Sequence, residues 1–305
     1  MIQDYFNLAL KNLRRKKLRS WLTILGILIS IMIIFFLISL SVGLSNAINE
    51  QFKMLGSDKF FIMAKGQLGA PGTGGAVQLT VDDVNIVEKV LGVKTATYFV
   101  AGNAKIEFNK KARYFMVMGL PMDKTDAFKV IAETANLKAD DGRLIEKADS
   151  EKVMIGYDYN YNNVFGKPIN AGNSIIINGK EFKVVGVLSK IGNPSDDKNI
   201  YMIMEDFKEL FNSGDRVDEI LVQVQNENEL KQVADKVKQK LMKFRDVTEK
   251  TIDFTILTPE ELLASIGVIL NVITVFLVGV AGISLLVGGV GIANTMYTSV
   301  LERTR

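Results

Sequence analysis

The sequence predicts an α+β membrane protein in which two long transmembrane helices, extended outward as a stalk, flank a mixed α/β domain outside the membrane. No charged side chain occurs from Trp21 to Leu44 or from Leu262 to Leu301. Each run exceeds the ~20 apolar residues that a helix needs to cross the hydrocarbon core. The segment between the runs is long, mixed in composition and nearly neutral, with 29 basic and 31 acidic residues over 45–260.

Basic residues set the expected orientation. A cluster that precedes the first apolar run favours the cytoplasmic side, and it consists of Lys11, Arg14, Arg15, Lys16, Lys17 and Arg19. Two spans then return the C-terminus to the cytoplasm and leave residues 45–260 outside the cell or inner membrane. A cleaved signal peptide is the alternative for the first run. That run exceeds the usual apolar region of about 7–15 residues and has no clear cleavage site.

The predicted organisation has five segments. Residues 1–19 form a cytoplasmic amphipathic and basic segment, with a helix over 2–13 that lies on the membrane or is a solvated leader. The remaining segments are the first spanning helix with its outward stalk (20–56), the extracytoplasmic domain (57–257), the second stalk and span (258–301) and the start of a cytoplasmic segment (302–305).

The second spanning helix has a clear predicted start. Thr258 is a typical N-cap, Pro259 suits the first helical position, and Glu261 can complete a capping box. A helix from Pro259 to about Val300 is about 63 Å long at 1.5 Å per residue, whereas the hydrocarbon core is about 30 Å thick. Part of this helix is therefore expected to project outward.

The outer domain is predicted as two strand–helix–strand halves around an insertion at about 125–210. Expected strands lie at 58–64, 93–101, 106–108, 112–119, 217–225 and 251–257, with helices at 80–91 and 227–244 and a Gly-rich loop at 66–76. Within the insertion, Asn178-Gly179 between strands 175–177 and 181–188 predicts a hairpin.

Several functional classes are excluded or disfavoured. The chain has no Cys and no His, which excludes disulfides, thiol chemistry and the usual zinc sites and nucleophilic triads. The Gly-rich loop lacks the ending of a phosphate loop, and the near-neutral domain does not predict nucleic-acid binding. We therefore expect no enzyme, cofactor site or metal site in this chain.

Two kinds of polar cluster are candidate sites. The pairs Asp82/Asp83, Asp140/Asp141 and Asp196/Asp197 are favoured as helix caps and turns over metal or acid–base roles. The polar aromatic segment 157–161 is favoured as packing and surface over ligand contact.

The apolar runs themselves contain packing signals. Ser284 with Gly288, and Gly289 with Ala293, have the small-xxx-small spacing that favours close helix packing. The runs contain no ionisable residue of the kind that lines ion pathways. They are therefore predicted to pack and transmit motion, and not to conduct ions.

The chain resembles the MacB/FtsX-type ABC transporter permeases along essentially its whole length. The resemblance rests on residues 282–296 (GISLLVGGVGIANTM) and 299–305 (SVLERTR) of the second run and on 18–27 (LRSWLTILGI) before the first. It also rests on four outer stretches, which are Asp141-Gly142-Arg143 with Asp149, Phe165-Gly166, residues 177–180 (INGK) and residues 182–187 (FKVVGV).

This resemblance implies a non-catalytic permease subunit that works by mechanotransmission, with ATP and Mg bound by a partner ABC ATPase and the permease acting as a homodimer or heterodimer. It implies an outer domain with a porter-like part and an inserted subdomain. Residues assigned to ATPase coupling are Ser299, Glu302, Arg303, Thr304 and Arg305, and those assigned to helix packing are Ser284, Gly288, Gly289, Gly291 and Ala293. Family members continue into two further spans, so the resemblance identifies this chain as a C-terminally truncated piece.

Two main functions remain open at this stage. The first is export or release of a lipoprotein, peptide or amphiphile outside the membrane. The second is an FtsX-like regulator that activates a cell-wall hydrolase through an extracytoplasmic protein partner. A sensor of an extracellular ligand is a weaker third option, because nothing in the sequence resembles an output domain.

Overall fold

The computed structural model describes residues 25, 28–29, 31–44, 46, 56–66, 77–123, 125–161 and 164–304. The chain divides into two compact units. We call residues 51–262 the α/β unit, and residues 1–50 with 263–305 the terminal unit. The predicted helix at 2–13, the outward continuation of the first span over 48–55 and the loop at 67–76 lie outside the described residues.

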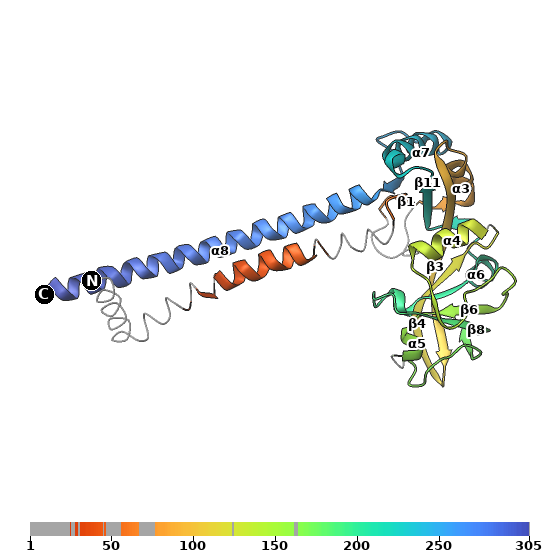
Figure 1. Ribbon diagram of the computed structural model, residues 1–305, viewed down its shortest axis with the longest axis horizontal. Helices are drawn as coiled ribbons and strands as arrows, with labels where there is room; N and C mark the ends of the chain where they lie inside the picture. Colours follow the sequence, from red (N-terminus) through yellow and green to blue (C-terminus); the bar gives the residue numbers. More distant parts are fainter. Residues whose placement is uncertain are drawn as a thin grey trace. The chain divides into compact units, whose positions relative to one another are not determined.

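A ten-stranded sheet forms the framework of the α/β unit (Figure 1). Its strand order is β12-β1-β11-β3-β4-β9-β6-β8-β5, with β7 paired to β3 and β8. The strands are β1 (Lys59–Ala64), β3 (Val93–Phe108), β4 (Lys111–Leu120), β5 (Ala139–Gly142), β6 (Lys152–Ile155), β7 (Ser174–Ile177), β8 (Lys180–Leu188), β9 (Ile200–Ile203), β11 (Glu219–Val224) and β12 (Phe254–Leu257). The short strands β2 (Leu79–Thr80) and β10 (Arg216–Val217) pair with each other.

Helices lie between the strands along the chain, and one long helix follows the last strand. The helices are α3 (Val81–Glu88), α4 (Thr125–Thr134), α5 (Asp158–Tyr161), α6 (Met204–Phe211), α7 (Leu230–Phe244) and α8 (Pro259–Thr304), with 3-10 turns η1 (Asp196–Lys198) and η2 (Glu227–Glu229). The first half, β1–α3–β3, and the second half, β11–α7–β12, interleave in the order β12-β1-β11-β3. All three of these pairings are antiparallel. The predicted strand–helix–strand halves are therefore present and form a split βαβ arrangement.

Alternation along the strands explains why α3 and α7 cover one face of this part of the sheet. Phe60 and Ile62 of β1 point into a core that also contains Ile220 of β11. Val233 and Val237 of α7 enter the same core, at the spacing of one helical turn. All five side chains are essentially inaccessible to solvent, so the packing of α7 on the sheet is fixed by ordinary apolar burial.

Strand β3 corrects one prediction. We expected separate strands at 93–101 and 106–108, whereas the structure has one strand of 16 residues. Its first part pairs with β11 and its second part, from Val100 to Phe108, pairs without interruption with β4. Gly102 lies within the strand and pairs with Val117 of β4. Its lack of a side chain leaves room for Phe211 of α6. A Cβ at Gly102 would lie 2.7 Å from the Phe211 ring.

Smaller boundary errors have local causes. Helix α3 ends at Glu88 and not near Leu91, because Val90 N bonds back to Val87 O in a tighter turn. The helix expected from Glu227 begins with the 3-10 turn η2, where the Asn226 side chain accepts a hydrogen bond from Asn228 N. The strand expected at 217–225 is split into β10 and β11, and the one expected at 251–257 is confined to β12.

The predicted hairpin in the insertion is confirmed. Strands β7 and β8 pair antiparallel on either side of Asn178 and Gly179. Both residues have positive φ, 48° and 87°, as the tight mirror-image turns of hairpins require. The Asn178 side chain also accepts a hydrogen bond from Lys105 N at 2.9 Å, which ties the turn to β3.

The Asp-Gly-Arg stretch of the resemblance has a structural role in the insertion. Gly142 of β5 pairs with Gly186 of β8. A Cβ on Gly142 would lie 2.2 Å from Val185 O, so no larger residue fits at this approach. Arg143 Nη2 donates to the buried carboxylate of Asp149 at 2.8 Å. That ion pair lowers the pKa of Asp149 far below its ordinary value, with Lys152 adding to the effect.

The terminal unit contains the apolar part of α8. One helix among the described residues is long and apolar enough to cross a membrane, Pro259–Thr298, with mean hydropathy 2.5. A shorter apolar helix occupies Ile31–Leu44, within the first predicted span. Ser41 Oγ and Thr274 Oγ1 lie 3.5 Å apart. The first full span stays a prediction, because several of its residues are outside the described part of the chain.

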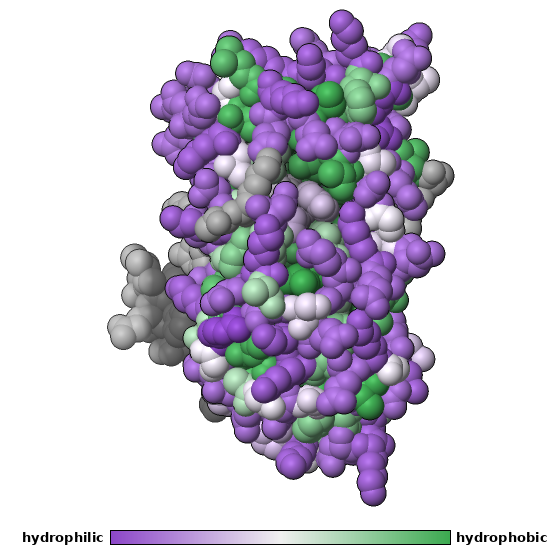
Figure 2. All heavy atoms as spheres, turned by 90° about the vertical axis from the view of Figure 1, so that its right-hand side faces the viewer, coloured by the Kyte–Doolittle hydropathy of each residue, from purple (hydrophilic) through white to green (hydrophobic). Residues whose placement is uncertain are grey.

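The two units differ in their surfaces. The face of the α/β unit shown in Figure 2 is mainly hydrophilic. In contrast, large apolar side chains along α8 are exposed, including Phe276 and Leu286 at 68% and 71%. An apolar surface of this extent on a helix indicates contact with lipid or with other apolar helices.

We predict a pH-dependent stability that originates from Glu219. Burial in the sheet, with a smaller effect of Asp218, raises the pKa of Glu219 to about 8. The folded state therefore holds this proton more tightly than the unfolded state, where the pKa is near 4.5. The contribution of the Glu219 proton to the free energy of unfolding is therefore fully present below pH ~4.5 and is lost as the pH rises through about 8.

The Glu219→Gln variant should be more stable than the wild type at pH 9 by at least about 1 kcal/mol, and the two should converge at pH 4.5. The measurement is denaturant unfolding followed by circular dichroism across this pH range. Glu133→Gln, an exposed change in α4, is the matched control and should leave the pH profile unchanged. Parallel profiles for wild type and Glu219→Gln would contradict the prediction.

Candidate functional site

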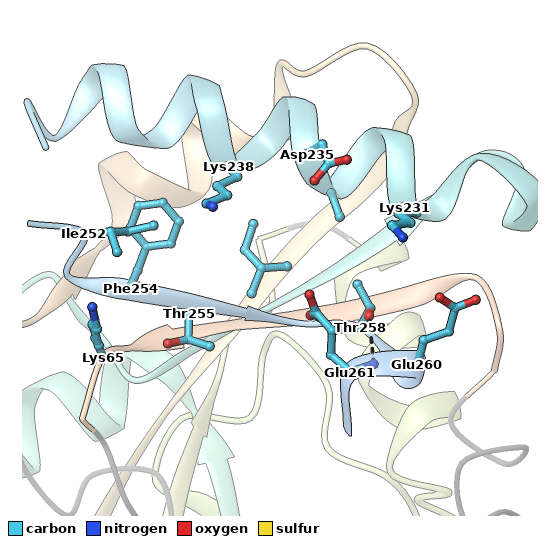
Figure 3. A pocket seen from close by; sticks show the side chains of 12 residues that line it. Lys65, Lys231, Asp235, Lys238, Ile252, Phe254, Thr255, Thr258, Glu260 and Glu261 are labelled. Atoms are coloured by element: carbon cyan, nitrogen blue, oxygen red, sulfur yellow. Dashed lines mark hydrogen bonds between the residues drawn. The ribbon is translucent and has the colours of Figure 1, made fainter. Parts of the chain in front are cut away.

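A cavity of about 330 Å³ lies beside the edge strand β12 (Figure 3). Helix α7 forms one wall, β12 forms the floor, and the first turn of α8 lies at one end (Figure 3). We call this the β12 groove, lined by Lys65, Lys231, Ala234, Asp235, Lys238, Ile252, Phe254, Thr255, Ile256, Thr258, Glu260 and Glu261. All of these residues belong to the α/β unit.

The outer edge of β12 borders this groove. Among the described strands, β12 pairs only with β1. The register aligns Met63 with Thr255 and Ala64 with Phe254, and Lys65 N donates to Asp253 O at 2.8 Å. Because hydrogen-bonded and non-bonded pairs alternate in an antiparallel ladder, the backbone N–H and C=O groups of Phe254 and Ile256 point away from β1.

Charged side chains of both signs surround the groove. Lys65 and Lys238 lie toward the beginning of β12. At the other end lie two carboxylates, Glu260 and Glu261, and one lysine, Lys231 (Figure 3). Lys238 Nζ forms an ion pair with Glu249 at 2.9 Å. Within the described residues, Lys65 and Glu260 have no ion-pair partner, so their charges remain available.

The capping box predicted for the second long helix is confirmed at the end of this groove. Thr258 N donates to Glu261 Oε2 at 3.1 Å, and Glu261 N donates to Thr258 Oγ1 at 3.2 Å. Helix α8 begins at Pro259, two residues after β12 ends at Leu257. The first turn of α8 is thus fixed to the strand that forms the groove floor.

Arg245 holds α7, the wall of the groove, beside the start of β12. It lies at the C-terminal end of α7, and its Nη1 donates to Asp83 of α3 at 2.7 Å. Its Nη2 donates to Asp253, just before β12, at 2.7 Å. The Asp83 side chain is fully buried, and the ion pair with Arg245 lowers the pKa of Asp253. One guanidinium therefore connects α3, α7 and the start of β12.

The predicted acidic pairs are structural. Asp83 contributes to the Arg245 network and also accepts from Thr80 N at 2.8 Å, as a helix cap does. Asp197 accepts from Ile191 N at 2.7 Å and closes a loop. Asp141 accepts from Ala171 N at 2.8 Å. These bonds agree with the interpretation as caps and turns.

The aromatic segment 157–161 has a mixed role. Tyr159 is buried against Phe115, with ring centroids 5.4 Å apart, and donates to Lys198 O. Tyr157 and Tyr161 stack on each other at 4.2 Å, and Tyr161 donates to Asp140. Packing and surface contacts therefore account for these side chains.

The residues that sequence reasoning assigned to coupling and helix packing all lie on α8, apart from Arg305, which is outside the described residues. Gly289 and Ala293 are exposed, and a Cβ at Gly289 would have no neighbour within 4 Å. The packing set (Ser284, Gly288, Gly289, Gly291, Ala293) and the coupling set (Ser299, Glu302, Arg303, Thr304, Arg305) therefore stay predictions. None of these residues lines the β12 groove.

Sequence comparison places the chain among transporter proteins. Residues 20–240 match the family model of the MacB-like periplasmic core domain. An uncharacterised ABC transporter permease of Methanocaldococcus jannaschii is 35% identical over 306 residues, covering 100% of this chain and 73% of that protein. The macrolide export ATP-binding/permease protein MacB of Bdellovibrio bacteriovorus is 25% identical, covering 99% of this chain and 47% of that protein. The uncharacterised ABC transporter permease YknZ of Bacillus subtilis is also 25% identical, with 99% and 75% covered.

Solved structures share the fold. The periplasmic region of MacB from Actinobacillus actinomycetemcomitans matches with a TM-score of 0.58 at 18% identity, over 72% of this chain and 98% of that one. The extracellular domain of the ABC-type transporter YknZ from Gram-positive bacteria matches with a TM-score of 0.50 at 15% identity, over 65% and 99%. These similarities support the mixed α/β fold of the unit that carries the groove.

We predict that Arg245→Met destabilises the α/β unit by about 3 kcal/mol, because removing one partner leaves the buried Asp83 carboxylate without its counter-charge. Denaturant unfolding of the full chain measures the change. Lys240→Met, an exposed change on the same helix, is the control and should change stability by less than about 0.5 kcal/mol. Equal effects of the two substitutions would show that the Arg245 network does not stabilise the fold.

Proposed function

We propose that this chain acts as a mechanotransmitter. The premise is that it belongs to the family of MacB-like periplasmic core domains and is a membrane-located permease subunit of an ABC transporter. ATP hydrolysis by a partner ATPase would be carried through α8 to the α/β unit, where a substrate or partner protein is engaged. The chain itself would be non-catalytic, and ATP and Mg would bind to the ATPase.

The observation that supports this proposal most directly is the continuity of α8. It is a single helix of 46 residues, about 69 Å long at 1.5 Å per residue. Residues Pro259–Leu262 of this helix belong to the α/β unit and the rest to the terminal unit. An uninterrupted helix transmits a displacement along its axis, because each turn is hydrogen-bonded to the next.

The lack of charge along this helix supports mechanotransmission over conduction. From Leu262 to Leu301 the sequence contains no ionisable side chain, whereas ion and proton pathways through a membrane generally use such residues. We infer that substrate is handled outside the membrane and does not pass between the spans.

Partner contacts are proposed from the family. Ser299 and residues 302–305 would begin the ATPase-facing segment, and the small residues from Ser284 to Ala293 would pack against a neighbouring helix in a homodimer or heterodimer. The basic cluster at 11–19 would keep the N-terminus in the cytoplasm and place the α/β unit outside. The complete transporter would export or release a lipoprotein, peptide or amphiphile.

The alternative is an FtsX-like regulator that activates a cell-wall hydrolase by the same movement. The two functions differ in what the α/β unit engages. Stimulation of the partner ATPase by lipoproteins, peptides or amphiphiles supports transport. A response only to a protein partner supports regulation, because a regulator needs no small substrate.

We predict that breaking α8 uncouples the two ends of the permease. Val272→Pro removes a helical hydrogen bond and disfavours the helix by about 3 kcal/mol, whereas Val272→Ala keeps the helix and is the matched control. With the complete permease and its ATPase reconstituted in lipid, Val272→Pro should abolish stimulation of ATP turnover by substrate while complex assembly is retained. Val272→Ala should preserve that stimulation.

Two results would contradict mechanotransmission. One is unchanged stimulation in an assembled Val272→Pro complex, since a kinked α8 would then still couple. The other is an ATPase that neither co-purifies with the complete permease nor changes its turnover when the permease is present.

A further inference from the structure

We propose that the β12 groove is a peptide-binding site, in which an extended segment of another protein adds to β12 as a further strand. This inference concerns what the α/β unit binds, and it does not require the coupling through α8 proposed above. It rests on the outer edge of β12, which no other strand in the described part of the chain pairs with, on the cavity beside that edge and on the charges at the ends of the cavity.

The edge of β12 carries the backbone groups that an added strand needs. The N–H and C=O groups of Phe254 and Ile256 point away from β1, as the register requires. They border the groove, which both residues line. An extended peptide would satisfy these groups with main-chain hydrogen bonds, as in other complexes formed by strand addition.

The two edges of the ten-stranded sheet differ in protection. At one end, β5 has the sequence ADDG, a short acidic edge that disfavours pairing with another chain. At the other end, β12 has the sequence FTIL and contains no Pro, Lys or other charged residue. Both edge strands have four residues, so they differ in charge and not in length. Because β12 lacks the charges and prolines with which natural proteins blunt exposed edges, its edge is better suited to pairing than that of β5.

The cavity provides space for the side chains of an added strand. Ala234 of α7 and Ile252 and Phe254 near β12 give its lining an apolar part, and the ring of Phe254 lies in the groove wall (Figure 3). The volume of about 330 Å³ falls at the lower end of the range for small-molecule sites. It therefore fits a few side chains of a peptide, while the main chain follows β12.

The end charges define the chemistry of the occupant. Lys65, with no ion-pair partner among the described residues, would attract a carboxylate at the beginning of β12. At the other end, where α8 starts, Glu260 and Glu261 outnumber the single lysine, Lys231, so the net negative charge there would attract a Lys or Arg (Figure 3). The inferred ligand is therefore an extended segment with an acidic residue and a basic residue separated by a short stretch in which apolar residues alternate.

The test uses two capped hexapeptides with the same composition. One is acetyl-Glu-Thr-Val-Thr-Val-Lys-amide and the other has the reverse order, so that each direction of strand addition has a matching charge pattern. The full chain is placed in lipid nanodiscs, and amide hydrogen exchange is measured at single-residue level with and without peptide. We expect one of the two to slow exchange at Phe254 and Ile256 at least about threefold. A version N-methylated at every internal amide, which can donate no main-chain hydrogen bond along either edge, should have no effect.

Two variants separate strand addition from other binding. Ile256→Pro removes an outward N–H and leaves the pairing with β1 in place, so it should lower peptide affinity about tenfold, whereas Ile256→Val should not. Lys65→Glu, an exposed change, should weaken the peptide about threefold, and replacing the peptide's Glu with Lys should restore binding. The second variant keeps the test decisive if Ile256→Pro does not fold.

The proposal is overturned if neither peptide protects β12, if the N-methylated peptide protects it equally, or if both variants bind like the wild type. It is also overturned if exchange at β12 slows with protein concentration in the absence of peptide, because the occupant would then be a second copy of this chain. None of these measurements involves the ATPase, so failure of the peptide site and failure of the coupling mechanism are distinguishable.

Discussion

The long strand β3 holds the α/β unit together, because it pairs with different neighbours along its length. Its residues from Val93 to Phe99 bond to β11, and those from Val100 to Phe108 bond to β4. The βαβ halves and the insertion therefore share one continuous sheet. Three cores form among the described residues of this framework, one around α7, one around the aromatic cluster that includes Tyr159 and Phe165, and one that includes Val130 and Ile131 of α4. The position of β12, at the far edge of that sheet, follows from the same strand order.

Residue types at short spacings in the sequence predict the elements that depend on contacts between nearby residues. The Thr258–Glu261 capping box, the Asn178-Gly179 hairpin and the apolar stripe of α7 involve residues at most a few positions apart, or a fixed helical spacing, so the sequence contains the whole signal. The interleaved strand order agrees with the two halves that periodicity suggested. Continuity of β3 was not predictable in the same way. The contact of Gly102 with the ring of Phe211, 109 positions later, has no local signal in the sequence.

The groove was missed for the same physical reason. Its lining comes from the end of β1, α7, β12 and the start of α8. The Thr258–Glu261 capping box predicts where α8 begins, but its spacing does not show that these residues lie beside α7 and β12. Arg245 and Asp83 are 162 positions apart, so the network that holds α7 beside β12 has no local signature either. One weak signal was present, the apolar FTIL segment directly before a capped helix, but only the strand order shows that this segment is an edge. In contrast, the coupling residues were predicted from the family resemblance, and the packing residues from the resemblance and from small-xxx-small spacing; those that the structure describes belong to α8.

The place where α8 begins would connect the proposed peptide site with the proposed mechanism. Thr258 and Glu261 fix the first turn of α8 to the end of β12, and Glu260 of that turn lines the groove. A strand added to β12 would therefore restrict the same segment from which the long helix starts. Conversely, a displacement of α8 along its axis would move the floor of the groove, because Leu257 and Pro259 are separated by a single residue. A ligand that binds β12 better in one position of α8 than in another would shift α8 toward that position. By linkage, a change in the position of α8 would change the affinity of the groove for the ligand by the same factor.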